Sequence, residues 1–214
     1  MSDPAPLTEI LDRMQRHHPA PLARDAVAAQ ETEERAARLA ERLKDVPARY
    51  AGAELEHPEA HAWVTRYLMD ERVDGLLITG PVGTGKTHLM WAIYRAIAEA
   101  DPERFGVVSA KIVQLLSRLR PGGDESHDYV SRLCRAPLLM LDDIGAQKGS
   151  EWVSERLYEI VDARYEAKRP IICTTNRKPD KLAETAGERV ASRLIEMCEI
   201  FPVLGGDRRL ELVR

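Results

Sequence analysis

The chain has 214 residues, of which 44% are hydrophobic, 31% charged and 5% aromatic, with a formal net charge of −4. This length suits one domain with a modest extension, and the acidic balance excludes a globally basic nucleic-acid-binding protein. We expect no membrane span and no signal peptide, because no long apolar run is present. The cysteines are few and widely spaced (Cys134, Cys173 and Cys198), which favours a reducing, cytoplasmic setting over disulfides or a zinc site.

The first 46 residues predict a helical extension. A short helix is expected over 7–16, and Pro21 suits the first turn of a longer, Ala-, Glu- and Arg-rich helix over 22–44. That helix has little apolar surface to bury, so it is either a solvated arm or a docking element for a partner. Pro47 ends it. We therefore divide the chain into an extension, 1–46, and a globular domain, 47–214.

Apolar periodicity then predicts the elements of the domain. Trp63, Val64, Tyr67 and Leu68 lie at helical spacing and indicate a core-packed helix over 57–70. Apolar strands alternating with helices predict an α/β fold, in which a five-stranded parallel sheet is covered on both faces to make three layers. The expected strands are 76–79, 105–109, 138–142, 170–175 and about 199–203, and the expected helices are 86–99, 110–120, 126–134, 151–168 and 187–196.

A phosphate-binding loop follows the first strand. Residues 80–87 match G-x-x-x-x-G-K-T and stand between an apolar strand and a helix, the context that this motif requires. Its glycines let backbone N–H groups turn toward phosphate oxygens, Lys86 reaches the β- and γ-phosphates, and the Thr87 hydroxyl binds Mg²⁺. The helix dipole adds to the site. The predicted nucleotide contacts are Gly80, Pro81, Val82, Gly83, Thr84, Gly85, Lys86, Thr87 and His88.

Two acids end the third predicted strand. Asp142 is positioned to hold Mg²⁺, in part through water, and Asp143 to orient or deprotonate an attacking water. The simpler interpretation is a strand that stops at an acidic turn. We favour the catalytic interpretation, because these acids follow a phosphate loop by some fifty residues, as such sites require.

Further candidate residues come after the strand at 170–175, at its end and on the predicted helix 187–196. Asn176, after the strand at 170–175, is placed to bond the γ-phosphate or the attacking water. Arg189 and Arg193 are four residues apart and share one helix face. An arginine donated to a neighbour's γ-phosphate stabilises transition-state charge. The alternative is that both are surface arginines paired with nearby glutamates.

These pieces occur together in four segments: GLLITGPVGTGKTHL (75–89), LLMLDDIGAQ (138–147), LYEIVDARYEAKRPIICTTN (157–176) and GERVASRL (187–194). In this order the chain resembles the AAA+ ATPases over about residues 47–203. Within them it resembles the DnaC/DnaI-type replicative helicase loaders and the IstB transposition helpers. The resemblance implies a P-loop NTPase fold of AAA+ type, and since the chain ends soon after the last strand we expect no separate C-terminal lid.

The resemblance also implies roles. An arginine finger acting in trans places active sites between subunits, so a nucleotide-dependent homo-oligomer is expected. Most AAA+ proteins have Glu where this chain has Asp143, and the shorter side chain predicts slow hydrolysis. By the match, Lys86 and Thr87 are Walker A residues, Asp142 and Asp143 are Walker B, Asn176 is sensor 1, and Arg193 is the finger, with Arg189 as second choice.

The implied function is an ATP- and Mg²⁺-dependent loader that assembles on single-stranded DNA and delivers a hexameric replicative DNA helicase, held by the N-terminal extension. In this branch a helical element after the second strand lines the DNA path. Here Lys111, Arg118 and Arg132 are the candidate phosphate contacts; the alternative is a solvated helix pair. Two other functions stay open: an IstB-like helper that delivers a transposase, and an ATP-gated adaptor with little turnover.

Overall fold

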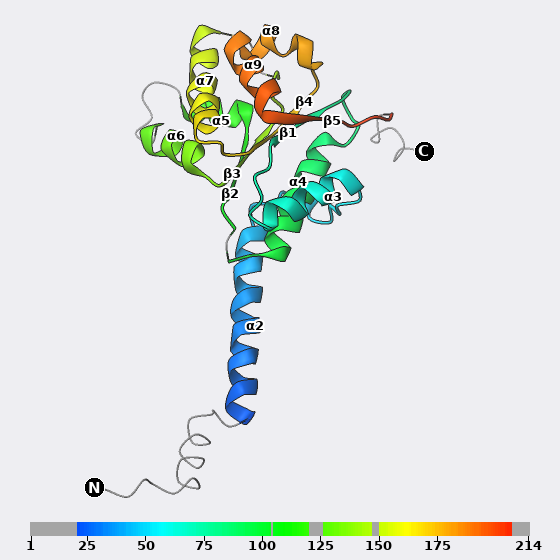
Figure 1. Ribbon diagram of the computed structural model, residues 1–214, viewed down its shortest axis with the longest axis vertical. Coiled ribbons are helices and arrows are strands. Elements are labelled where there is room, and N and C mark those ends of the chain that lie inside the picture. Colours follow the sequence, from blue (N-terminus) through cyan, green and yellow to red (C-terminus); the bar gives the residue numbers. More distant parts are fainter. Residues whose placement is uncertain (1–20, 104, 120–125, 147–149, 207–214) are drawn as a thin grey trace, which may run out of the picture.

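The computed structural model describes residues 21–103, 105–119, 126–146 and 150–206, so the helix predicted over 7–16 lies outside the described residues. Five parallel strands form one sheet in the order β2-β3-β4-β1-β5. The predicted five-stranded parallel sheet is therefore confirmed (Figure 1). The strands are β1 (Gly75–Thr79), β2 (Val107–Lys111), β3 (Leu138–Asp142), β4 (Ile171–Thr175) and β5 (Cys198–Pro202).

Alternate side chains of each strand enter two separate cores, which makes the fold three-layered. Leu76 and Ile78 face one core together with Trp63 and Ile93, whereas Leu77 faces the other. On the first face lie α3 (Pro58–Leu68) and α4 (Lys86–Ala100). The second face carries α5 (Ile112–Arg118), α6 (Ser126–Arg135), α7 (Glu151–Glu166), α8 (Ala183–Ala186) and α9 (Glu188–Met197).

The edge strand β2 begins two residues later than predicted. The Phe105 ring packs edge-on against Tyr94 at 4.8 Å between centroids. Gly106 lies against Pro137, so that a Cβ there would come within 2.5 Å of the proline ring. Ladder pairing therefore starts at Val107, and the predicted strand 105–109 becomes 107–111. As a result Lys111 ends a strand instead of opening a helix, and the next helix is 112–118, not 110–120.

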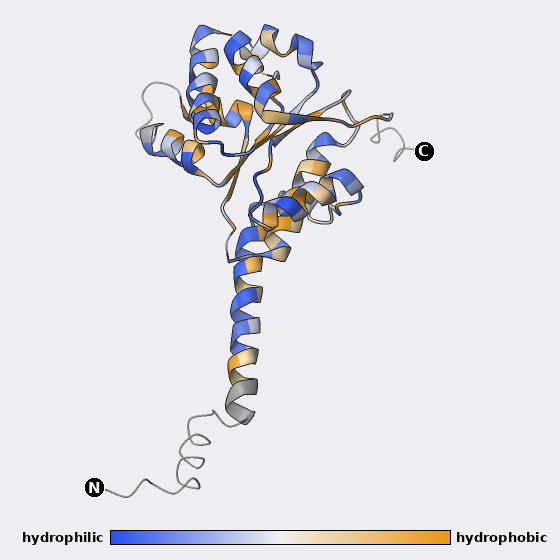
Figure 2. Ribbon diagram, in the orientation of Figure 1, coloured by the Kyte–Doolittle hydropathy of each residue, from blue (hydrophilic) through white to orange (hydrophobic). Residues whose placement is uncertain are grey.

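The long helix α2 (Pro21–Leu43) begins at the proline that the sequence suggested and extends away from the domain (Figure 1). Residues 26–38 are exposed, and α2 is coloured mostly as hydrophilic in Figure 2. Only its last turns pack on the domain, where Leu39 and Leu43 contact the core beneath α4. Among the described residues, no helix is both long and apolar enough to cross a lipid bilayer.

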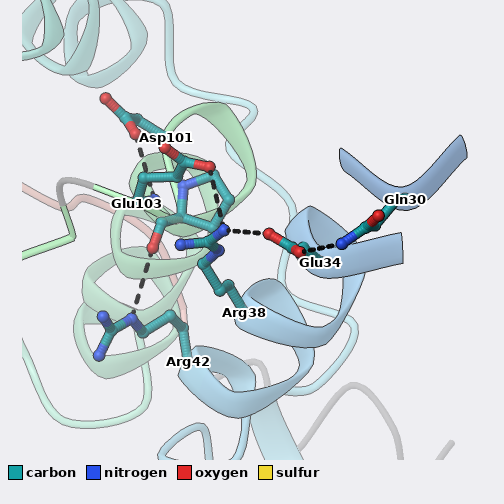
Figure 3. A network of polar contacts seen from close by, with 7 residues as sticks. Gln30, Glu34, Arg38, Arg42, Asp101 and Glu103 are labelled. Carbon is teal, nitrogen blue, oxygen red and sulfur yellow. Dashed lines mark hydrogen bonds and ion pairs between the residues drawn. The ribbon is translucent and has the colours of Figure 1, made fainter. Parts of the chain in front are cut away.

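Polar contacts fix α2 to the carboxyl end of α4. Arg35 Nη2 donates to the carbonyl oxygens of Glu99 (3.1 Å) and Ala100 (2.9 Å). The last turn of α4 has no basic residue of its own, so Arg35 supplies the positive charge that a helix C-terminus favours. The Arg38 guanidinium pairs with Glu34 on α2 at 3.0 Å and with Glu103 at 3.8 Å (Figure 3).

Candidate nucleotide-binding site

The loop between β1 and α4 has the backbone that a phosphate-binding turn needs. Gly80 has φ of 152°, and a Cβ there would lie 2.3 Å from the carbonyl oxygen of Val203. Gly85 has φ of 100° and is the N-cap of α4. Because glycine has no side chain to cap the helix, the first N–H groups of α4 stay available to an anion. Both glycines of the motif are thus required by geometry.

The functional side chains of the loop meet Asp142 across the sheet. The Thr87 hydroxyl donates to Asp142 Oδ1 at 2.9 Å, and the Thr174 hydroxyl donates to the same oxygen at 2.7 Å. Lys86 is nearly buried, and its ammonium donates to the carbonyl oxygen of Pro81 at 2.7 Å. Asp142 itself is 5% exposed. A buried carboxylate held by two hydroxyl groups beside a phosphate loop is arranged to receive a cation.

These residues fit Mg²⁺ bound together with a triphosphate. In proteins Mg²⁺ takes one or two carboxylates, waters and substrate phosphates rather than an all-protein cage. Within the described part of the chain, no group of three or more His, Cys, Asp or Glu side chains is placed to hold a metal. Thr87 and Asp142 would therefore supply the protein ligands of such a site, with phosphate oxygens and waters as the others.

The second acid and the sensor residue lie at neighbouring strand ends. Asp143 is exposed with φ of 66°, and its N–H donates to Thr174 Oγ1 at 2.8 Å. Aspartate tolerates this left-handed conformation better than most residues do. Asn176 follows β4, which lies between β1 and β3. Because of this strand order, Asn176 lies between the phosphate loop, which follows β1, and Asp142 and Asp143, which end β3.

His88, the last predicted nucleotide contact, lies in the first turn of α4. Its ring meets Tyr50 edge-on at 6.4 Å between centroids, and Tyr50 stacks on Trp91 at the same separation. Tyr50 belongs to the short helix η1 (Ala48–Tyr50) at the start of the domain. The side chain of His88 therefore packs toward η1.

The candidate finger residues lie on a different pair of elements. Arg193 on α9 pairs with Asp162 on α7, with 3.1 Å between Nε and Oδ1, and with Glu196 at 3.8 Å. Arg189 is exposed and lies over the Tyr158 ring at 5.5 Å. Within one subunit, then, both arginines contact α7. The glutamate pairing that the sequence offered as an alternative is present for Arg193.

The three candidate DNA contacts share one cleft beside the edge strand. Lys111, Arg118 and Arg132 line a cavity of about 420 Å³ together with Asp142. Lys111 pairs in register with Asp142 on the neighbouring strand. The cleft therefore reaches from the three cations to the proposed metal-binding acid.

One residue of the site and one at the opposite ends of the strands were not predicted. Thr174 bridges Asp142 and Asp143; the only sequence signal was a threonine at the polar end of an apolar strand. Arg164 on α7 is fully buried, and its guanidinium donates to the carbonyl oxygens of Leu133 and Ala136, both at 2.8 Å. Burial, with Arg169 nearby, lowers the pKa of Arg164 to about 10. This arginine stays charged at neutral pH and ties α6 to the start of β3.

Comparison with known proteins agrees with this geometry. The bacterial DnaA ATPase domain family matches residues 52–198, more than half of the chain. The replicative helicase loader DnaC of Escherichia coli K12 is 29% identical over 126 residues, which are 58% of this chain and 51% of DnaC. The chain thus corresponds to about half the length of that relative.

Solved structures give the same placement. The crystal structure of the DnaC helicase loader superposes with a TM-score of 0.63 at 29% identity, covering 74% of this chain and 100% of that chain. AMPPCP-bound DnaA from Aquifex aeolicus shares the fold, with a TM-score of 0.56 at 24% identity over 72% of this chain and 49% of that chain. The chain therefore belongs to the bacterial DnaA ATPase domain family, which confirms its resemblance to the AAA+ ATPases of the helicase-loader branch.

Proposed function

We propose that this chain is an ATPase that loads a replicative DNA helicase onto single-stranded DNA. The proposal that the chain binds and hydrolyses ATP rests on the contact of Thr87 and Thr174 with the buried Asp142 beside the phosphate loop. The loader part is supported by the relation to DnaC, which is named a replicative helicase loader. The protein chemistry is phosphoryl transfer to water.

Charge neutralisation and positioning account for most of the catalysis in this reaction class. The loop N–H groups and Lys86 hold the phosphates, and Lys86 exchanges the Pro81 carbonyl oxygen for a phosphate oxygen. Thr87 and Asp142 hold Mg²⁺, which when bound neutralises charge on the phosphates. Asp143 orients or deprotonates the attacking water, and its short side chain makes turnover slow.

The remaining roles need a second subunit and partners. Asn176 senses the γ-phosphate in its own subunit, and Arg193 completes the site of a neighbour, so a nucleotide-dependent homo-oligomer is the active form. Lys111, Arg118 and Arg132 contact DNA phosphates in the cleft that reaches Asp142. Residues 1–46 hold the hexameric helicase, and residues 47–214 form the ATPase domain.

Calorimetry and phosphate release test the ATPase. The full chain should bind ATP with Mg²⁺ and hydrolyse it slowly, faster when a dT oligonucleotide is present. Lys86→Ala should abolish nucleotide binding, because the loop loses its charge. Asp143→Asn should keep binding and lose hydrolysis. Unchanged turnover in Asp143→Asn would contradict the enzyme and favour an adaptor that only binds nucleotide.

Affinity capture from cell extract tests the partner. The full chain, tagged at its C-terminus, should retain a hexameric DNA helicase identified by mass spectrometry. The matched control is the same chain with residues 1–34 removed, which keeps the contacts of Arg35, Leu39 and Leu43 with the domain and should lose that partner while its ATP binding stays unchanged. Recovery of a transposase in place of a helicase would overturn the loader and favour the IstB-like helper.

A further inference from the structure

Two arginines of α9 face three side chains of α7, and these helices lie side by side (Figure 1). The closest contact is made by Arg193, whose Nε lies 3.1 Å from Asp162 Oδ1. The guanidinium carbon of Arg193 lies 4.0 Å from the centre of the Tyr165 ring. The guanidinium thus has a carboxylate at its edge and an aromatic face against its plane.

A third group closes this arrangement. Glu196, one turn along α9, lies 3.8 Å from Arg193 Nη1, and the Tyr165 hydroxyl donates to Glu196 Oε1. Arg193 is therefore held by three residues, Asp162, Tyr165 and Glu196. We call these three residues the α7–α9 clamp. The arginine and the clamp are partly open to solvent: the side chain of Arg193 is 33% exposed, that of Asp162 22% and that of Glu196 57%.

The clamp conflicts with the role of an arginine that acts on another subunit. A finger must turn its donor fork toward a γ-phosphate outside its own chain. In the free subunit the same guanidinium is turned toward Asp162 and stacked on Tyr165. The single N–H of Nε cannot donate to Asp162 and to a neighbour's phosphate at once, so an arginine that uses this edge of its guanidinium on a phosphate must leave the clamp.

Resting on the proposed function, we propose that the α7–α9 clamp holds Arg193 against its own subunit while that subunit is free. When the subunit assembles on a nucleotide-loaded neighbour, Arg193 leaves the clamp and binds the neighbour's phosphate. Asp162 and Tyr165 are then positioning residues that set how readily subunits become active together. They touch no reacting atom themselves.

The chemistry makes this exchange reversible. Partly exposed ion pairs and cation–π contacts are weak, so the clamp orients Arg193 without locking it. A phosphate carries more charge than a carboxylate and accepts two parallel guanidinium bonds, so it competes well for the same fork. Arg189 rests at 5.5 Å on the ring of Tyr158, which also bonds Arg193, so substitutions of Asp162 and Tyr165 leave the ring under Arg189 in place.

ATP hydrolysis measured against protein concentration tests the proposal. Asp162→Asn should lower the midpoint, which is the protein concentration at half-maximal specific activity, by about fivefold. The reason is that the contact of Arg193 with Asp162 no longer competes with assembly. Tyr165→Leu should lower it in the same direction by removing the stacked ring. Glu159→Gln is the matched control, because Glu159 pairs with Arg156 on the same helix at 2.7 Å and does not touch Arg193. It should leave the midpoint unchanged.

The outcomes separate this inference from the proposed function. Loss of hydrolysis in Arg193→Ala with a shifted midpoint in Asp162→Asn supports both. The same loss with an unshifted midpoint in Asp162→Asn and Tyr165→Leu overturns the clamp and leaves the finger in place. Wild-type hydrolysis in Arg193→Ala overturns the finger, and the clamp with it.

An NMR measurement that needs no ATP hydrolysis tests the proposal even if a variant folds poorly. In chain labelled with ¹⁵N-arginine, the Arg193 Nε–H should exchange slowly with solvent at low protein concentration, because it donates to Asp162. Adding AMPPCP and Mg²⁺ at assembling concentration should shift this signal, and Asp162→Asn should abolish its protection. An Arg193 Nε–H signal that is unchanged on assembly would overturn the exchange.

Discussion

At the scale of single residues, Thr174 has the most specific role that the sequence did not reveal. Its hydroxyl donates to Asp142 and accepts from the N–H of Asp143. One side chain thus orients both acids of the site. Nothing in its position within an apolar strand indicated this, because the contact depends on how β3 and β4 pair.

We predict that Thr174→Val slows hydrolysis roughly tenfold or more, since leaving buried polar groups unpaired costs about 1–3 kcal/mol. Single-turnover hydrolysis measures the effect, and calorimetry without Mg²⁺ should show nearly unchanged ATP binding. Thr174→Ser keeps the hydroxyl and should stay close to the wild-type rate. A valine variant as fast as wild type would show that the hydroxyl does not orient the acids.

Arg164 is a residue whose importance is structural. It is fully buried, and its Nη1 and Nη2 groups donate to the carbonyl oxygens of Leu133, Ala136, Pro137 and Pro170. We expect Arg164→Leu to cost about 3 kcal/mol or more, because these acceptors lose a charged donor. For a domain of this size that corresponds to a fall in Tm of roughly 6–12 °C.

Calorimetric melting checks this prediction, with Arg66→Ala as control. Arg66 makes an exposed ion pair with Glu199 at 3.1 Å, and removing such a pair costs about 1 kcal/mol at most. Equal melting temperatures for the two variants would mean that the buried guanidinium adds no stability.

At the scale of elements, the sequence predicted β1, β3 and β4 to within one residue, because these strands are short apolar runs that end at polar tips. It placed β2 two residues early. Phe105 belongs to the apolar run but packs on Tyr94 instead of joining the ladder.

The four-residue helix α8 was missed, since so short a helix has no periodicity to read. In the site, motif residues were predictable; contacts between separate strands were not.

The end of α7 allows a prediction about helix termination. Lys168 has φ of 52°, and the following N–H, that of Arg169, returns to the Arg164 carbonyl oxygen at 2.9 Å. This is a Schellman-type end, where glycine is favoured. We expect Lys168→Gly to stabilise the chain by about 0.5–1 kcal/mol, because glycine reaches this conformation without a steric cost.

Urea denaturation measures this change as a higher midpoint at unchanged slope. Asp70, after α3, is the matched case: its φ is 56°, and the N–H of Glu71 returns to the Arg66 carbonyl oxygen at 3.2 Å. Asp70→Gly should give a smaller gain, because aspartate tolerates this conformation better than lysine. A lower midpoint for Lys168→Gly would contradict the argument.

At the scale of the whole molecule, charge is unevenly placed on a chain that is acidic overall. Three cations, Lys111, Arg118 and Arg132, meet in the cleft beside β2. If each neutralises one phosphate of single-stranded DNA, changing all three to Gln should flatten the slope of log K against log salt concentration by about 2, at roughly 0.7 per phosphate.

Fluorescence anisotropy with a labelled dT oligonucleotide, at a series of salt concentrations, measures that slope. Lys168→Gln is the control, because Lys168 precedes β4 at the opposite ends of the strands and should leave the slope unchanged. An unaltered slope in the triple variant would place the DNA elsewhere on the molecule.

The attachment of α2 has a mechanical consequence. Helix α4 begins at Lys86 of the phosphate-loop motif and ends at the carbonyl oxygens that accept hydrogen bonds from Arg35. With 23 residues, α2 is about 34 Å long, so a tilt of ~5° at its root displaces its tip by about 3 Å. A tilt of α4 that followed nucleotide binding would therefore move the far end of α2, well outside the domain, through the contacts between Arg35 and the end of α4.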